Sequence, residues 1–170
     1  MCDRERCFLN DVWTIYFHAS GDPDWTLGSY VRVADICCVE EFAHISREIE
    51  TRVRGNMFFL MREGIYPCWD DPCNLYGSSL SLKVPMEEAT KAWWSLGALI
   101  LGETLCDEMA CVNGFSVSPK RNFCIFKIWL RDADRVRADF ALPDWYEGEV
   151  IFKKHVDCIH ANSAPPPQRQ

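Results

Sequence analysis

The chain has 170 residues, enough for one domain with a sizeable core, and it is acidic, with a formal net charge of −7 and a pI near 5.1. Because general binders of the nucleic-acid backbone are basic, this charge excludes non-specific binding and leaves only a nucleic acid held by a few local residues. No apolar run has the length of a membrane span, so we expect no membrane partner.

The ten cysteines allow a disulfide framework or a zinc site. The first residues, MCDRERCFLNDVW, lack the apolar stretch of a signal peptide, which favours a reducing compartment such as the cytoplasm. The pairs Cys68–Cys73 and Cys106–Cys111 each have four intervening residues and no histidine pair follows, unlike paired zinc knuckles. We therefore expect reduced, mostly buried thiols, no metal and no cofactor.

Six segments have the β-branched and aromatic composition of strands. In chain order they are residues 12–19, 57–64, 79–84, 114–117, 123–129 and 149–154. Proline, asparagine and glycine mark the segments between them, and 71–77 and 118–122 are predicted hairpin loops.

Apolar residues recur at helical spacing in three places. The first helix is marked by Val39, Phe42, Ile45, Ile49 and Val53. The second has Pro85 in its first turn and runs from Met86 to about Glu103, and the third is the charged segment 131–142.

Strands joined largely by hairpins, with a few helices to cover one face, predict an α+β fold. We expect a single domain with a curved antiparallel β-sheet and about three helices packed on its convex face. The domain is expected to cover residues 9–160, after an N-terminal extension of residues 1–8 and before a disordered tail of residues 161–170.

The second predicted helix is apolar on more than one side. One stripe suits the sheet and consists of Trp93, Leu96 and Ile100. The other consists of Trp94, Gly97, Ala98 and Leu101. This second stripe is either buried as well or an outer docking surface for a partner helix, and the sequence favours neither.

The segment EGIYPCWDDPCN places Trp69 directly before Asp70 and Asp71, and Trp25 lies in a second turn, GDPDWTLG. A loop tryptophan usually covers the core. Two facing indoles, by contrast, can clamp a flat ring. Stacking then contributes about 1–3 kcal/mol per base, and a cationic ring gains about 2 kcal/mol more when desolvated.

A carboxylate beside such a clamp selects the ring. It accepts hydrogen bonds from both N1–H and N2–H of guanine, whereas adenine presents an acceptor at N1. Two tryptophans and one acid therefore predict a pocket for a positively charged guanine such as 7-methylguanine. Because Asp70 and Asp71 are adjacent, they point apart on an extended turn, which argues against a catalytic acid pair.

Four stretches extend this prediction to most of the chain. They are WTIYF, CVEEFA, EGIYPCWDD and AWWSLGALILGE, and Trp25 follows the first of them. In this order they resemble the motifs of the mRNA cap-binding translation initiation factor 4E family, from about Leu9 to Phe152. The chain is similar to a divergent paralogue, and a kinetoplastid is one candidate source.

The resemblance implies that Trp25 and Trp69 sandwich the methylated guanine of the cap. It also implies that Asp70 reads N1 and N2 in place of the family's glutamate, which is one methylene longer, and that Trp129 contacts the N7-methyl group. The candidate cations for the triphosphate bridge are Lys120, Arg121 and Lys127. The family's own basic positions carry other residue types here, so these three are either phosphate ligands or ordinary solvated charges.

The resemblance further implies capped mRNA and a 4G-type scaffold protein, or a competing helical peptide, as partners of a cytoplasmic monomer that is not an enzyme. The residues of the partner-binding face are Val39, Ala43, Trp94 and Leu101. Ala43 stands where the family has a tryptophan. We therefore expect a reshaped groove that takes a helix with different anchors or binds the usual one more weakly.

Two other functions stay open. A nucleotide- or cap-processing hydrolase would hold a metal on Glu63, Asp70 and Asp71, although no Gly-rich phosphate loop is present and these acids are not spaced along a helix. A cysteine–histidine nucleophile pair is not excluded among ten cysteines and four histidines. An interaction module that has lost cap binding would use Trp94 and Leu101 as its contact.

Overall fold

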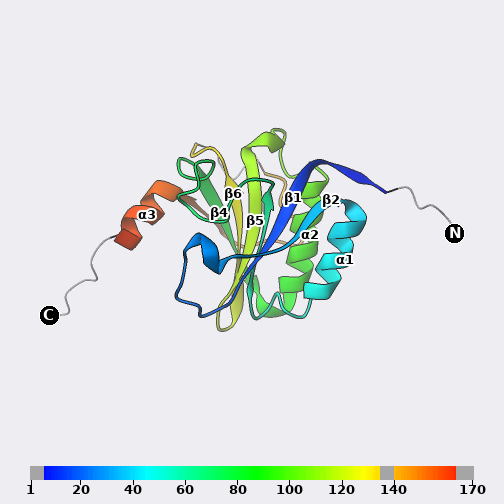
Figure 1. The fold of residues 1–170 in the computed structure, drawn as a ribbon, viewed down its shortest axis with the longest axis horizontal. Coiled ribbons are helices and arrows are strands. Elements are labelled where there is room, and N and C mark those ends of the chain that lie inside the picture. The colour runs from blue at the N-terminus through cyan, green and yellow to red at the C-terminus, as the bar shows by residue number, and fades with distance from the viewer. Residues whose placement is uncertain (1–5, 135–139, 164–170) are drawn as a thin grey trace.

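Seven antiparallel strands form one sheet in the computed structural model, which describes residues 6–134 and 140–163. The strand order across the sheet is β2-β1-β3-β5-β6-β4-β7 (Figure 1). The strands are β1 (Phe8–His18), β2 (Val31–Cys38), β3 (Met57–Arg62), β4 (Ser78–Pro85), β5 (Val112–Pro119), β6 (Phe123–Leu130) and β7 (Val150–Lys154). The helices are α1 (Val39–Ile49), α2 (Ala89–Leu101) and α3 (His155–Ser163), with 3-10 turns η1 (Leu27–Ser29), η2 (Met86–Glu88) and η3 (Met109–Cys111).

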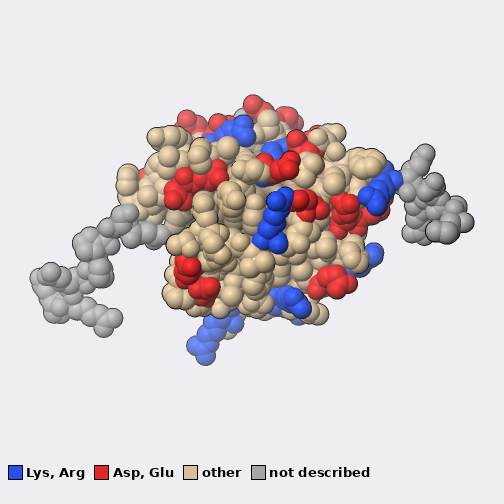
Figure 2. Space-filling view, in the orientation of Figure 1, with Lys and Arg blue, Asp and Glu red and all other residues tan. Residues whose placement is uncertain are grey.

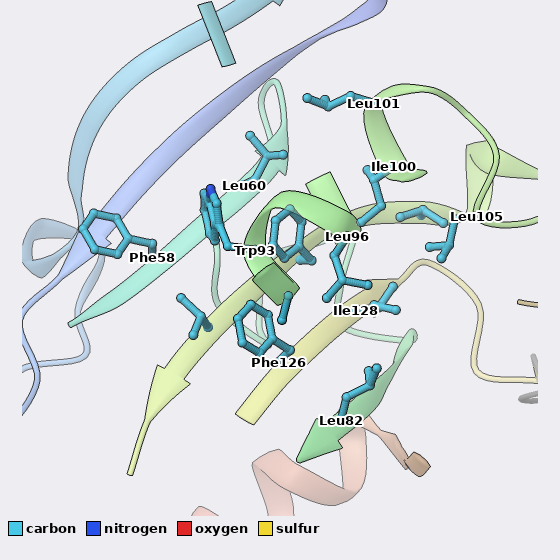
Figure 3. Close-up of a cluster of buried hydrophobic side chains, with 14 of the residues drawn as sticks. Phe58, Leu60, Leu82, Trp93, Leu96, Ile100, Leu101, Leu105, Phe126 and Ile128 are labelled. Carbon is cyan, nitrogen blue, oxygen red and sulfur yellow. The ribbon is translucent and has the colours of Figure 1, made fainter. Parts of the chain in front are cut away.

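The helices α1 and α2 cover one face of the sheet, and Trp93 of α2 lies in the middle of the core beneath them (Figures 1 and 3). The buried residues that the strands contribute include Phe58, Leu60, Leu80, Leu82, Phe115, Phe126 and Ile128. The Trp93 ring lies 4.8 Å from that of Phe115, and its Nε1 donates a hydrogen bond of 3.0 Å to Ser46 Oγ on α1. This bond satisfies the indole inside the core and ties α2 to α1.

The opposite face of the sheet carries a smaller apolar cluster. Its buried members are Tyr16, Phe59, Met61, Ile65 and Trp129, and the residues packed against them include Tyr30 and Trp69. Tyr30 and Trp69 belong to the connections from β1 to β2 and from β3 to β4, which therefore fold back over this face. The helix α3 also lies away from α1 and α2, beyond the other side of the sheet (Figure 1).

The α+β fold predicted from the sequence is confirmed, and all six predicted strands are present. The prediction lacks β2, an edge strand on which Val31 and Val33 are exposed and Ile36 is buried. The segment 118–122 forms the β5–β6 hairpin as predicted. The segment 71–77 is not a hairpin, because β5 and β6 lie between β3 and β4 in the sheet.

The predicted helices differ from the structure at three places. The helix α1 ends at Ile49, so Val53, the last residue that marks the first predicted helix, lies buried in the turn that follows. The helix α2 begins at Ala89, because Pro85 ends β4 and η2 precedes the helix. The described parts of the third predicted helix, 131–134 and 140–142, are not helical, and residues 135–139 lie outside the described residues. The third helix is instead α3, which extends into the predicted tail, so of the helices in the described residues only α1 and α2 cover the core face. Residues 1–5 and 164–170 of the predicted extension and tail also lie outside the described residues.

The cysteines are less buried than the sequence predicts. Of the nine in the described part of the chain, Cys38, Cys111 and Cys124 are buried and the others are half-buried or exposed. In the same part of the chain, no helix is both long and apolar enough to cross a membrane.

Gly97 permits the close contact between α1 and α2. A Cβ atom at this position would lie 2.2 Å from Cζ of Phe42, whose ring also contacts Trp93 and Trp94. Gly97→Ala is therefore expected to lower the free energy of unfolding by about 1–3 kcal/mol, although alanine favours a helix more than glycine. Urea unfolding followed by circular dichroism measures this change. Gly55→Ala, where the nearest atom is 4.0 Å away, is the control, and equal stability of the two variants would contradict this packing.

Candidate functional site

Trp129 forms the floor of the sheet face opposite α1 and α2. It lies on β6 between Ser79 of β4 and Gly114 of β5. Its Nε1 donates a hydrogen bond of 3.0 Å to Ser116 Oγ, and the ring of His155 lies 5.2 Å away. Only 4% of Trp129 is exposed, so it supports the groups above it and offers little surface of its own to a ligand.

The loop that carries Trp69 is held by Asp71 and Asn74. Asp71 is 8% exposed, and its carboxylate accepts hydrogen bonds from the backbone N–H of Tyr66 (3.0 Å) and Cys73 (2.8 Å). The Nδ2 of Asn74 donates to the carbonyl oxygen of Tyr66 at 2.9 Å. Trp69 is therefore half-buried on a well-braced loop, and its buried Nε1 has no hydrogen-bond acceptor among the described residues.

Asp70 is the exposed acid of the pair, so the prediction that the two aspartates point apart is confirmed. Burial raises the pKa of the Cys68 thiol to about 12, and a hydrogen bond with Asp70 adds to the rise. Burial likewise raises the pKa of Tyr30 to about 12, and the charges of Cys68 and Asp70 add to it. Tyr30 of the β1–β2 connection and Trp69, the neighbour of Asp70, pack against the same apolar cluster, so the loop of Asp70 lies beside that connection.

Trp25 lies on the same connection as Tyr30 and is 55% exposed. Its indole stacks on the ring of His18 at 4.3 Å and 8°, and the ring of Tyr30 is 6.5 Å away. His18 is itself fixed, because its ring nitrogens lie 3.0 Å from the carbonyl oxygen of Ala19 and 2.8 Å from that of Asp24. One face of the Trp25 indole is thus covered by a fixed ring, and the exposed remainder is open to a second one.

Lys127 projects from β6 toward the two tryptophans on this face. Its Nζ lies 5.2 Å from the ring centroid of Trp69 and 5.8 Å from that of Trp129. Burial lowers the pKa of this ammonium, and the charges of Lys153 and Lys120 lower it further. Lys127 is therefore half-buried against aromatic rings, at the inner end of a group of cations, and not a fully solvated loop charge.

This group, the basic cluster, consists of Lys120, Arg121, Lys127 and Lys153. Lys120 and Arg121 are exposed at the turn of the β5–β6 hairpin. Figure 2 shows basic side chains that project at the bottom of the view, where Figure 1 places this hairpin. No salt bridge joins the basic cluster to a carboxylate of the described residues, whereas Arg32 and Lys91 elsewhere pair with acids. The charge of the cluster is therefore available to an anionic ligand.

The predicted partner-binding residues lie on the other side of the molecule, on α1 and α2. Val39 is exposed, Ala43 and Trp94 are half-buried, and the Trp94 ring meets that of Phe42 edge-on at 5.6 Å. Leu101 is 8% exposed and belongs to the core. The second stripe of α2 is thus partly core and partly surface, and three of the four predicted residues are accessible to a partner.

Three residues of the site, Lys153, His18 and Tyr30, are absent from the sequence prediction. A signal for Lys153 exists, because EVIFKK ends a predicted strand with two lysines that must point to opposite faces. His18 and Tyr30 lack such a signal, since their roles come from contacts between β1 and the connection that follows it.

A family model described as "Eukaryotic initiation factor 4E" matches residues 8–164 of the chain. Initiation factor 4E-4 of Caenorhabditis elegans is 28% identical over a gapped alignment of 160 positions, which covers 84% of this chain and 72% of that protein. Initiation factor 4E of Candida albicans is 28% identical over a gapped alignment of 178 positions, which covers 93% of this chain and 83% of that protein. A mimivirus homologue is 38% identical over 67 residues, but the match spans only 25% of the viral protein.

Solved structures show the same fold. Caenorhabditis elegans eIF4E-3, solved with the 4E-binding protein Mextli and a cap analogue, superposes with a TM-score of 0.77 at 21% identity and covers 95% of this chain and 98% of that chain. Ascaris suum eIF4E-3, solved with an m2,2,7G cap, gives a TM-score of 0.68 at 22% identity and covers 79% of this chain and 77% of that chain.

The two adjacent aspartates should respond differently to substitution. Asp71→Ala leaves two backbone N–H groups of the loop without their acceptor and is expected to lower the free energy of unfolding by about 2–3 kcal/mol. Asp70→Ala removes an exposed side chain and should change it by less than about 0.5 kcal/mol. Urea unfolding measures both variants, and a larger loss for Asp70→Ala would contradict the assignment of Asp71 as the brace of the loop.

His155 should make stability depend on pH. It is fully buried, its Nδ1–H donates to the carbonyl oxygen of Asn74 at 2.7 Å, and burial lowers the pKa of its imidazole. The unfolded chain therefore binds this proton at a higher pH, near the usual value of about 6.5. The stability that His155 contributes is present above that pH and is lost as the pH falls toward the lower pKa of the folded state.

His155→Asn, which keeps an N–H donor but does not titrate, is expected to lose less stability than the wild type between neutral and mildly acidic pH. Thermal unfolding across this range tests the difference. His160→Asn on the exposed side of α3 is the matched control. Parallel pH profiles of His155→Asn and the wild type would contradict the expectation.

Proposed function

Because the chain belongs to the eukaryotic initiation factor 4E family, we propose that it binds the 7-methylguanosine 5′ cap of mRNA in the cytoplasm and acts in translation initiation without catalysis. The observation that carries this proposal is the arrangement on the face opposite α1 and α2. Trp69 and the exposed Asp70 beside it come from one connection, and Trp25 comes from the other, next to Tyr30. The basic cluster, which has no carboxylate partner among the described residues, begins at Lys127 beside Trp69.

The methylated guanine would stack between Trp25 and Trp69. Trp25 offers the indole face that His18 does not cover, and Trp69 stands on the loop braced by Asp71. Stacking contributes about 1–3 kcal/mol per base, and the positive charge of 7-methylguanine adds cation–π attraction. Asp70, exposed and next to the β1–β2 connection, would accept hydrogen bonds from N1–H and N2–H and so exclude adenine.

The triphosphate bridge would lie along the basic cluster. Lys127 is nearest to the indoles, and Lys120 and Arg121 extend the positive charge to the tip of the β5–β6 hairpin. Lys153 on β7 pairs with Ser79 of β4, which pairs with Trp129 of β6, so Lys153 lies on the same face of the sheet as Trp129. Trp129 would support the methylated edge of the base from below, since only its margin is exposed. A chain of net charge −7 can bind a polyanion in this way because its cations are gathered at one place.

A helical segment of a 4G-type scaffold, or of a competing protein, would dock on α1 and α2. The structure of Caenorhabditis elegans eIF4E-3 with the 4E-binding protein Mextli supports a protein partner for this fold. The accessible anchors here are Val39, Ala43 and Trp94, while Leu101 would support Trp94 from within the core. We propose that the chain acts as a monomer between the cap and this partner.

A cap hydrolase is the competing proposal. It needs Glu63, Asp70 and Asp71 to share a metal, yet both carboxylate oxygens of Asp71 accept hydrogen bonds from backbone amides of its own loop. In the part of the chain that the structure describes, no group of three or more histidine, cysteine or acidic residues is placed to hold a metal ion. The relatives named above are initiation factors, which favours a binding role.

Tryptophan fluorescence tests the cap site. 7-methyl-GTP is expected to quench the emission at much lower concentration than GTP, because only the methylated ring is cationic. Trp69→Ala should weaken 7-methyl-GTP binding by about tenfold to a hundredfold, and Asp70→Asn by a similar factor, since one acceptor oxygen becomes a donor. Trp145→Phe, whose indole bonds to Ser95 on the helix side, is the control and should bind as the wild type does.

The opposite results have distinct meanings. Equal quenching by the two nucleotides would remove the case for a cationic ring, and full affinity in Trp69→Ala would refute the site. Release of hydrolysis products from a cap analogue during long incubation with Mg²⁺ would support the hydrolase.

A further inference from the structure

A hollow lies beside Arg121 of the basic cluster, at the end of β4 and β6 that is remote from Trp129. It is a cavity of about 560 Å³ lined by Lys83, Pro85, Arg121, Asn122 and Phe123. Arg121 is also a predicted phosphate contact of the cap, but Lys83 and Phe123 belong neither to the predicted cap contacts nor to the partner-binding face.

The Phe123 ring and Lys83 form a cation–π contact. The Nζ of Lys83 lies 4.5 Å from the centroid of the Phe123 ring. Phe123 is half-buried, whereas Lys83 and Arg121 are exposed. Neither cation forms a salt bridge with a carboxylate of the described residues, so both remain able to bind an anion that lies over or beside the ring.

The cavity lies on the same face as the proposed cap site. Along β6, Cys124, Phe126, Ile128 and Leu130 are buried on the core side, so the alternate residues Phe123, Lys127 and Trp129 share the other side. Lys83 pairs with Ile125 across β4 and β6 and belongs to this side as well. Phe123 and Lys127 are four residues apart, which is about 13 Å along an extended strand.

Along β6, Trp129, Lys127 and Phe123 therefore follow one another on one face of the sheet, from the proposed cap site to the cavity. A guanine held at Trp69 directs its phosphates toward Lys127 and the hairpin, because the basic cluster lies there. The next group of a capped RNA chain after those phosphates is a nucleoside, and a chain that continued in the same direction would bring it to the end of β6, where Phe123 lies. A nucleoside followed by a phosphate needs an aromatic face with cations beside it.

We propose that this cavity binds the first transcribed nucleotide of capped RNA, with its base on the Phe123 ring and its 3′-phosphate between Lys83 and Arg121. This proposal rests on the cap-binding function proposed above. Every base has a π-face, so the site accepts any base and adds affinity without reading sequence. The chain thereby distinguishes a capped RNA from a free cap nucleotide.

The test compares two ligands on the full chain: 7-methyl-GTP and a cap joined to a short RNA that begins with adenosine. The wild type is expected to bind the capped RNA about fivefold or more tightly than 7-methyl-GTP. Phe123→Ala should abolish this difference and leave the affinity for 7-methyl-GTP unchanged. Phe8→Ala, which truncates an exposed aromatic ring on β1, is the matched control and should keep the difference.

Two further measurements distinguish the contribution of the Phe123 ring to binding from that of the Lys83 charge. Lys83→Met should reduce the salt dependence of capped-RNA binding by about one ion and leave that of 7-methyl-GTP unchanged. A capped RNA whose first nucleotide lacks a base should bind the wild type no more tightly than it binds Phe123→Ala. Thermal unfolding of Phe123→Ala and Phe123→Leu confirms that the variants are folded.

Each outcome decides one of the two proposals. Equal affinity of the wild type for the two ligands overturns the second site and leaves the cap site standing. A loss of 7-methyl-GTP affinity in Phe123→Ala equal to the loss of capped-RNA affinity also overturns it, because Phe123 would then serve the cap or the fold. If the wild type binds neither ligand, the cap-binding function fails and the second site fails with it.

Discussion

Strict alternation of side chains along β4 and β6 couples the core of this protein to its binding face. On one face, Leu82 and Ile128 belong to the same buried core as Trp93 of α2 (Figure 3). On the other face, the intervening positions present Lys127 and Trp129. A slip of one residue in register would turn the indole of Trp129 into the core and expose Ile128. The burial of apolar side chains under the helices therefore fixes where the functional side chains stand.

The positive charges of the basic cluster are concentrated at one place on the surface. The chain carries a net charge of −7, yet the four cations of the basic cluster have no carboxylate partner among the described residues. Half-burial of Lys127 against two indoles keeps one of these charges in a desolvated setting, where its interaction with a phosphate is stronger than in water. Asp70, on the braced loop beside Trp69, supplies the opposite charge at the base end. A ligand with a cationic ring and an anionic tail matches this polarity.

The sequence predicts those parts of the structure that depend on local pattern. Six strands and the first two helices are visible in spacing and composition. The helix α3 is not, because it depends on His155 docking against the carbonyl oxygen of Asn74, far away in the chain. The prediction that the two aspartates diverge needed only their adjacency, but the choice of Asp71 as the loop brace depends on which amides turn toward it. The contact of Lys127 with Trp69 depends in the same way on the path of the β3–β4 connection, which no short motif encodes.

The central claim is that indoles from the β1–β2 and β3–β4 connections close on one methylated guanine. A crystal structure of the chain with 7-methyl-GDP tests it most directly. We predict that the base lies in van der Waals contact with the rings of both Trp25 and Trp69, and that both carboxylate oxygens of Asp70 accept hydrogen bonds from N1–H and N2–H. A base bound elsewhere, or stacked on one indole while the other remains remote, would contradict the claim.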